Sequence, residues 1–150
     1  MTFIRFPAAA FAAVAAVLAA GSAVRADCLD FDDAAVRVVR GVISGVAGAG
    51  DVAYRVGHSE AGSGHVQGAV EVQWTQAGNT LRQTIFHGMH DGPPAVLART
   101  ARGLQLRVQY CPAGAEACRA RTATYVYDPG RRRFRGANEA GRAFAATTCE

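Results

Sequence analysis

The sequence predicts a mainly β protein: a small antiparallel β-sandwich or barrel of about eight short strands, tied by disulfides. Two observations lead to this fold class. Several runs alternate apolar and polar residues with a period of two, and Gly, Pro or Asn turn residues separate these runs at near-regular spacing. Four cysteines, at positions 28, 111, 118 and 149, supply an even number of sulfur atoms for disulfides.

Residues 1–26 have the pattern of a secretory signal peptide. Residues 8–20 are almost entirely Ala, Val, Leu and Phe, and Val24 and Ala26 put small residues at the −3 and −1 positions of a cleavage site. The apolar run is too short and too rich in alanine to cross a membrane, which needs roughly 20 strongly apolar residues. We expect export to the periplasm or to the outside of the cell, no transmembrane segment, and a single β-rich domain at 27–150.

The sequence allows two assignments for the first element of this domain, a strand or a helix. The run from Val36 to Ile43 is dense in β-branched residues and contains Gly41, and both features are unfavourable inside a helix. Aspartates at positions 30, 32 and 33 are suited to a helix start, however, and apolar residues recur behind them at helical spacing. We predict a strand, with a short N-terminal helix over 31–47 as the alternative.

Four further strands follow, with turn residues between them. The clearest of them places Val66, Val70, Val72 and Trp74 on one face and polar residues on the other. Residues 57–65, which are rich in Gly and Ser, precede this strand and predict a mobile surface loop. The predicted strands are 51–56, 66–74, 80–87 and 95–100.

Residues 103–135 predict an antiparallel meander of three strands. Apolar residues alternate with polar ones from Leu104 to Tyr110 and again over 122–127, and Asp128 begins a turn. The shared apolar face places Leu106 and Val108 in the core, together with Trp74. Two registers follow from the turns. In the first hairpin, Cys111 lies opposite Cys118, so Leu106 pairs with Ala123, Leu104 with Tyr125, Arg107 with Thr122 and Gln105 with Thr124. In the second hairpin, a two-residue Pro129-Gly130 turn pairs Tyr125 with Phe134 and Tyr127 with Arg132.

The cysteines predict disulfides formed in an oxidising compartment, because their number is even and they follow a signal peptide. Of the three pairings that four cysteines allow, Cys111–Cys118 with Cys28–Cys149 is favoured. The first pair spans the predicted hairpin, and the second ties the two ends of the mature chain. A zinc site is the alternative, but the chain has no C-x-x-C pair. We expect no cofactor.

Charge is divided unevenly along the chain. Residues 27–81 carry three arginines against seven acids, whereas residues 82–142 carry eleven arginines against four acids. The meander register places Arg131, Arg133 and Arg135 on the outer face with Arg107, a row that is suited to carboxylates or phosphates. We predict that these four arginines bind an acidic protein or an anionic polymer of the cell envelope. A solvated outer face is the alternative.

A second set of candidate residues is His87, His90 and Asp91. Imidazole and carboxylate groups are suited to holding a metal ion or to acting as a base and its orienting acid. These residues lie where a predicted strand ends and a Gly-Pro-Pro loop begins. The two histidines are three residues apart, which does not match the helical H-E-x-x-H pattern. Exposed loop histidines are therefore the simpler interpretation, and a small metal-assisted hydrolase that uses His87 and His90 is the alternative function.

These observations favour an exported non-enzymatic binding module of a bacterial-type cell envelope, acting through the arginine face or the 57–65 loop. A purely structural envelope protein is a third hypothesis, and nucleic acid is not an expected partner. The small, exported, β-rich, disulfide-tied outline resembles that of the periplasmic lysozyme inhibitors. The Ser-Gly-x-x-Tyr loop of some of those families is absent after Ser63, so the resemblance assigns no family.

Overall fold

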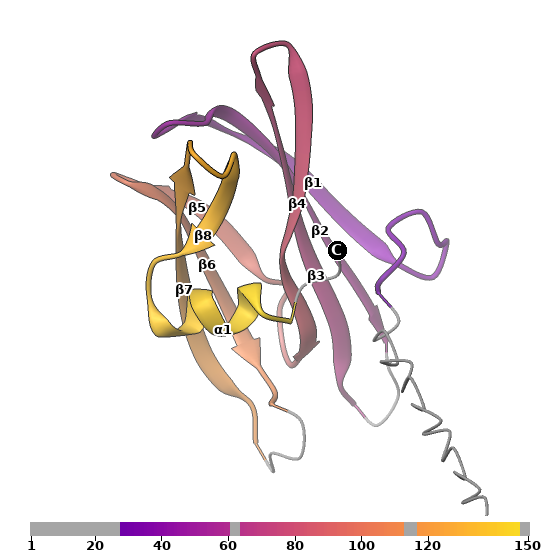
Figure 1. The fold of residues 1–150 in the computed structure, drawn as a ribbon. Coiled ribbons are helices and arrows are strands. Elements are labelled where there is room, and N and C mark those ends of the chain that lie inside the picture. The colour runs from indigo at the N-terminus through magenta and orange to yellow at the C-terminus, as the bar shows by residue number, and fades with distance from the viewer. Residues whose placement is uncertain (1–27, 61–63, 113–116, 148–150) are drawn as a thin grey trace, which may run out of the picture.

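The computed structural model describes residues 28–60, 64–112 and 117–147 (Figure 1). The predicted signal peptide at 1–26 lies outside the described residues. Within them the chain forms antiparallel strands and one short helix: β1 (Arg37–Val46), β2 (Gly50–Glu60), β3 (Val66–Gln76), β4 (Asn79–His90), β5 (Val96–Thr100), β6 (Gly103–Tyr110), β7 (Arg119–Asp128), β8 (Arg133–Gly136) and α1 (Glu139–Ala145). The mainly β prediction with eight strands is confirmed.

One sheet contains all the strands, in the order β1-β2-β3-β4-β6-β7-β8, and β5 pairs with β6 off this path. The joint between β4 and β6 is a single residue pair, His90 with Tyr110. Because the joint is so short, the sheet bends there into two layers. Figure 1 shows β1–β4 in one layer and β5–β8, with α1, in the other. The sheet does not close on itself, so its form is that of a sandwich or an open barrel.

The N-terminal region is a strand, as predicted, and the alternative helix over 31–47 does not form. Residues 31–36 make turns, and β1 begins at Arg37. Valine and isoleucine keep β1 extended because their branched side chains suit a pleated strand better than a helix.

The predicted surface loop at 57–65 is wrong in its first part. Residues 57–60 continue β2 and pair with β3, from Gly57 opposite Ala69 to Glu60 opposite Val66. Gly57 allows another side chain to pack closely against the strand and does not mark a mobile loop. A Cβ there would lie 2.6 Å from Cδ2 of Leu29, which covers this face of the sheet.

The central meander confirms one predicted register and corrects the other. β6 and β7 pair as expected, with Leu106 opposite Ala123, and the predicted Cys111–Cys118 disulfide is present. In the next hairpin the predicted two-residue turn is wrong. The loop has four residues, 129–132, so Tyr127 lies opposite Phe134 and Tyr125 opposite Gly136.

The longer turn has a local cause. The Asp128 carboxylate accepts hydrogen bonds from the backbone N–H groups of Gly130 (3.0 Å) and Arg131 (3.2 Å), and Arg132 has a φ of 51°. An aspartate that binds its own following backbone stabilises such a turn. The shift equals two residues, so each side chain keeps its predicted face.

Cys28 is disulfide-bonded. Its predicted partner, Cys149, lies outside the described residues.

The helix α1 was not predicted. Asn138 caps it, since its side-chain oxygen accepts from Gly141 N at 2.9 Å and also from Thr124 N of β7 at 3.0 Å. Phe144 of α1 is buried, and its ring lies 4.9 Å from the Phe86 ring centroid. The helix therefore fills the opening between the two layers. No helix in the described ranges is long and apolar enough to cross a membrane.

The core lies between the two layers. Trp74, Leu106 and Val108, all predicted to be inside, are 3%, 0% and 6% exposed. The Trp74 ring makes edge contacts with the rings of Tyr127 and Phe134, at centroid distances of 5.7 and 5.1 Å. Aromatic residues from both layers thus hold the layers together.

Gln83 of β4 ties the core to β8 through a pair of hydrogen bonds. Its side-chain amide donates to the Phe134 carbonyl at 2.8 Å, and its side-chain oxygen accepts from Phe134 N at 2.8 Å. One side chain therefore satisfies both polar groups of a backbone position on the outer edge of β8, where a further strand would otherwise pair.

Replacing Gln83 with leucine should lower the free energy of unfolding by about 1–3 kcal/mol, because the Phe134 N–H and C=O then lose their partners. Urea denaturation measures this loss. Gln109→Leu is the matched control, since Gln109 is exposed on β6, and it should change stability by less than about 0.5 kcal/mol. Equal losses in the two variants would show that the amide pair is not what stabilises β8.

Candidate functional site

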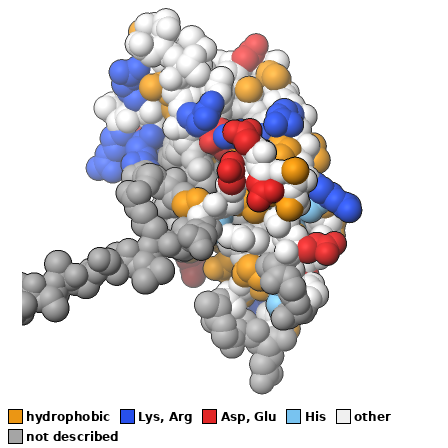
Figure 2. Space-filling view, turned by 90° about the vertical axis from the view of Figure 1, so that its right-hand side faces the viewer, with side chains coloured by type: hydrophobic (Ala, Val, Ile, Leu, Met, Phe, Trp, Pro, Cys, Tyr) orange, Lys and Arg blue, Asp and Glu red, His pale blue; other side chains and the backbone are white. Residues whose placement is uncertain are grey.

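A groove of about 480 Å³ lies on the outer face of β1–β4. The face of the molecule in Figure 2 carries arginine and acidic side chains beside one another, with hydrophobic side chains between them. The groove is lined by charged, polar and apolar residues together, among them Arg40, Val42, Arg55, Glu71, Gln73 and Arg82.

The strand registers explain why these residues meet. Arg40 of β1 lies directly opposite Arg55 of β2, and Arg55 lies opposite Glu71 of β3. Arg82 of β4 lies opposite Gln73 of β3. Residues opposite one another on antiparallel strands point to the same face of the sheet, so these three arginines and Glu71 share the outer face.

Glu71 is the electrostatic centre of the groove. It is only 9% exposed. Arg55 holds its carboxylate with two hydrogen bonds, Nε to Oε1 at 2.9 Å and Nη2 to Oε2 at 3.2 Å. Arg82 reaches the same carboxylate, Nε to Oε1, at 3.3 Å. A buried carboxylate requires such partners, and here two guanidinium groups share it.

Arg55 is held in place from its other side as well. Its guanidinium carbon lies 4.2 Å from the centroid of the Phe31 ring, a cation–π contact. Its Nη1 lies 3.9 Å from Oδ1 of the exposed Asp32. The turn at residues 31–36, which precedes β1, therefore fixes one wall of the groove.

Arg40 differs from the other two arginines. In the described parts of the chain, no carboxylate forms an ion pair with it. It also lies opposite Arg55, and like charges in directly opposed positions destabilise a sheet. The groove therefore carries an excess of guanidinium groups over carboxylates, an arrangement that is suited to receiving an anion.

The arginines predicted from the meander do not form one compact row. Arg133 and Arg135 lie in β8, whereas Arg131 lies in the turn before it. Arg107 lies opposite Thr122 of β7, and Arg135 lies opposite Val126. These two positions on β7 are about 13 Å apart along the strand.

Of the predicted arginines, Arg133 lies opposite the acidic Asp128. The structure thus distributes the predicted binding residues over two strands and a turn.

The structure does not bring His87 and His90 together. The Nε2 atom of His87 lies 3.0 Å from the Gln67 amide nitrogen, whereas the ring of His90 lies over Gly68. Because Gln67 and Gly68 are neighbours on β3, the two histidines occupy opposite faces of the sheet. Both are buried, and burial lowers the pKa of each below its usual value.

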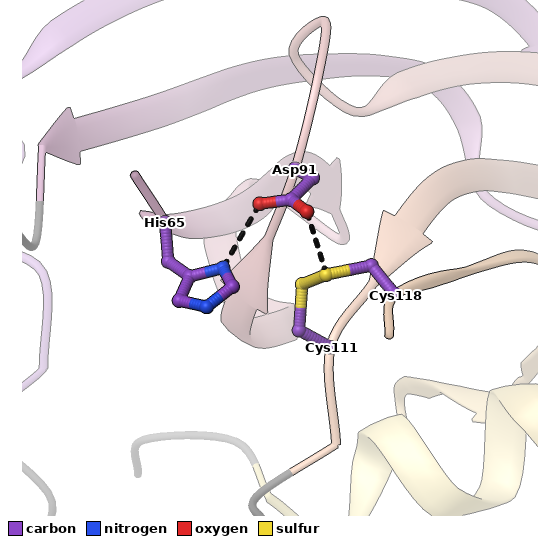
Figure 3. Close-up of side chains that lie close together, drawn as sticks. All are labelled: His65, Asp91, Cys111 and Cys118. Carbon is purple, nitrogen blue, oxygen red and sulfur yellow. Dashed lines mark hydrogen bonds and ion pairs between the residues drawn. A yellow bond between two sulfur atoms is a disulfide. The ribbon is translucent and has the colours of Figure 1, made fainter. Parts of the chain in front are cut away.

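Asp91, the third residue of that predicted set, lies instead beside His65 and the disulfide (Figure 3). One carboxylate oxygen of Asp91 is 3.0 Å from Nδ1 of His65, and the other is 2.9 Å from Sγ of Cys118. The ligand atoms of His65, Asp91, Cys111 and Cys118 all lie within 4.8 Å of one another. Sulfur atoms in a disulfide are not thiolates, however, so in this state the cluster offers a metal only an imidazole and a carboxylate.

The groove residues were missed in the sequence because they come from four different strands, β1 to β4, and not from one stretch of the chain. Arg40, Arg55 and Arg82 are isolated there among apolar or polar neighbours. Only the registers of three successive strand pairs reveal that they share one face with Glu71. The sequence does contain one indication of the site: Arg55 and Glu71 occupy outward-facing positions in two strands whose apolar and polar residues alternate clearly.

No protein-family model, no curated protein and no solved structure matches this chain.

Proposed function

We propose that this protein is a non-enzymatic binding module of the cell envelope and that it takes an acidic partner into the groove on β1–β4. The observation that supports the proposal best is the position of Arg40, which faces Arg55 and lacks an acidic partner within the described chain. An anionic group bound between these two arginines would replace their mutual repulsion with two attractions.

The chemistry of the groove favours carboxylates or phosphates as the bound groups. A guanidinium group presents planar N–H donors that match both anions, often with two parallel hydrogen bonds. Arg55 already has this geometry towards Glu71. Val42, 64% exposed, adds apolar surface at the edge of the groove. The partner therefore combines negative charge with apolar groups.

Charge reversal at Arg40 should weaken binding of an acidic probe by about tenfold or more, which corresponds to about 1.4 kcal/mol. The probe is a short oligomer of L-glutamate, and the dissociation constant is measured by titration calorimetry at low salt. Binding should also weaken as salt rises from about 50 to 200 mM, because screening shortens the reach of exposed charges. The melting temperature should not fall in Arg40→Glu, because an exposed arginine contributes little to stability and the new carboxylate would face Arg55.

Two matched variants locate the site. Arg37→Glu reverses the same charge on the same strand, but on the opposite face, since Arg37 lies opposite His58. Arg133→Glu reverses a charge of the predicted meander surface. Both should keep affinity within about threefold of the unmodified protein. If Arg133→Glu lost binding and Arg40→Glu did not, the meander face would be the site and the groove would not.

A further inference from the structure

β1 is an edge strand with one side open. It pairs with β2 on one side, and the described chain places no strand against its other side. Two large apolar residues on it are exposed, Val39 at 50% and Val42 at 64%. An open edge presents unpaired N–H and C=O groups, which can pair with the backbone of another chain.

Only part of this edge is free. Nη1 of Arg99, from β5, lies 3.4 Å from the carbonyl oxygen of Ser44 and 3.5 Å from that of Gly45. The register with β2 also shifts between Ile43 and Val46, so the strand bends there. The regular, open part of the edge is therefore 37–43, which is about 23 Å long.

The open edge and the groove are continuous. Arg40 and Val42 line the groove and belong to β1. A strand added beside β1 would lie about 4.8 Å away, so its groove-facing side chains would reach Arg40. Its other side chains would lie beside Val39, on the opposite face of the sheet.

We infer that the partner is an extended acidic segment of a protein, which adds to β1 as a further strand. This inference rests on the proposed function and names the partner's class. The segment alternates acidic side chains, directed to the groove and Arg40, with apolar ones beside Val39. Backbone hydrogen bonds supply a part of the affinity, and the side chains select the sequence.

The charge of β1 argues against a second copy of this chain as the occupant. β1 carries two arginines, Arg37 and Arg40, and no acid. Two β1 strands placed side by side would bring four positive charges into one small region. Charged residues on an edge protect it from pairing with itself. Here Arg40, on the groove face, would attract an acidic strand.

A comparison of two probes tests this inference. The first is a blocked peptide of alternating Glu and Val, about six residues long. The second is an acrylate oligomer with the same number of carboxylates, which has no backbone amides. We expect the peptide to bind at least about tenfold more tightly than the acrylate. We also expect it to slow hydrogen exchange of backbone amides within 37–43, followed by NMR, and we expect Arg40→Glu to abolish both effects.

The outcomes separate this inference from the proposed function. If neither probe binds, the groove is not an anion site and both proposals fail. If both bind equally and no amide of β1 gains protection, the groove binds anions but no strand is added. If those amides are protected without any probe, and protection rises with protein concentration, the occupant is a second copy and the inference is overturned.

Discussion

Replacing Leu106 with alanine is expected to lower the free energy of unfolding by about 2–5 kcal/mol. Leu106 is fully buried, at 0% exposure, and lies in β6 between β5 and β7, opposite Leu97 and Ala123. Alanine would leave a cavity among these residues, because a packed core relaxes only in part. Urea denaturation measures the loss. Stability of small domains is about 5–15 kcal/mol, so the variant is expected to unfold at a much lower urea concentration.

The neighbouring Gln105→Ala is the control. Gln105 lies on the outer face of the same strand, opposite Thr124, and its loss should cost well under about 1 kcal/mol. The alternation of buried and exposed side chains in β6 predicts this contrast. Similar losses at the two positions would contradict the assignment of the inner and outer faces.

Acid is expected to destabilise the protein below pH 6.5. Burial lowers the pKa of both His87 and His90 in the folded state, whereas both return to about 6.5 on unfolding. The unfolded chain therefore binds more protons as the pH falls below 6.5, and unfolding becomes more favourable. Each histidine should contribute up to about 1.4 kcal/mol per pH unit in this window.

Urea denaturation at several pH values between about 7.5 and 5 measures this slope. For His90, burial is the main cause, and a nearby His58 also disfavours its charged form, whereas Asp91 favours it. His87→Gln removes one of the two groups and keeps a polar side chain near Gln67. This variant should show about half the slope. An unchanged slope would mean that His87 takes up its proton equally well in the folded and unfolded states.

The fold was largely predictable because its signals are local. Alternation over a few residues identified the strands, and the disulfide between Cys111 and Cys118 fixed the register of β6 and β7. The following turn was mispredicted because the side chain of Asp128 lengthens it. The helix was missed because seven residues make too few turns to show a helical period.

The candidate site was not predictable for a different physical reason. Arg40, Arg55 and Glu71 are brought together by pairing between strands, and a shift of one residue in any pair would send a side chain to the other face. The register of β3 and β4 also shifts between Val70 and Glu71, next to the site itself. No local pattern marks such a shift.

The amide pair between Gln83 and Phe134 has a consequence for where the sheet can accept another strand. At the β8 end of the sheet, this side chain occupies the place that a neighbouring strand would need. Repeating head-to-tail assembly requires two complementary free ends on each copy. Within the described residues, the chain itself therefore blocks the β8 end, whereas the β1 end stays open, so a segment that adds to β1 finds no matching free edge at β8. Gln83→Leu would free the β8 edge for pairing with another chain, so self-association, and not stability alone, would change.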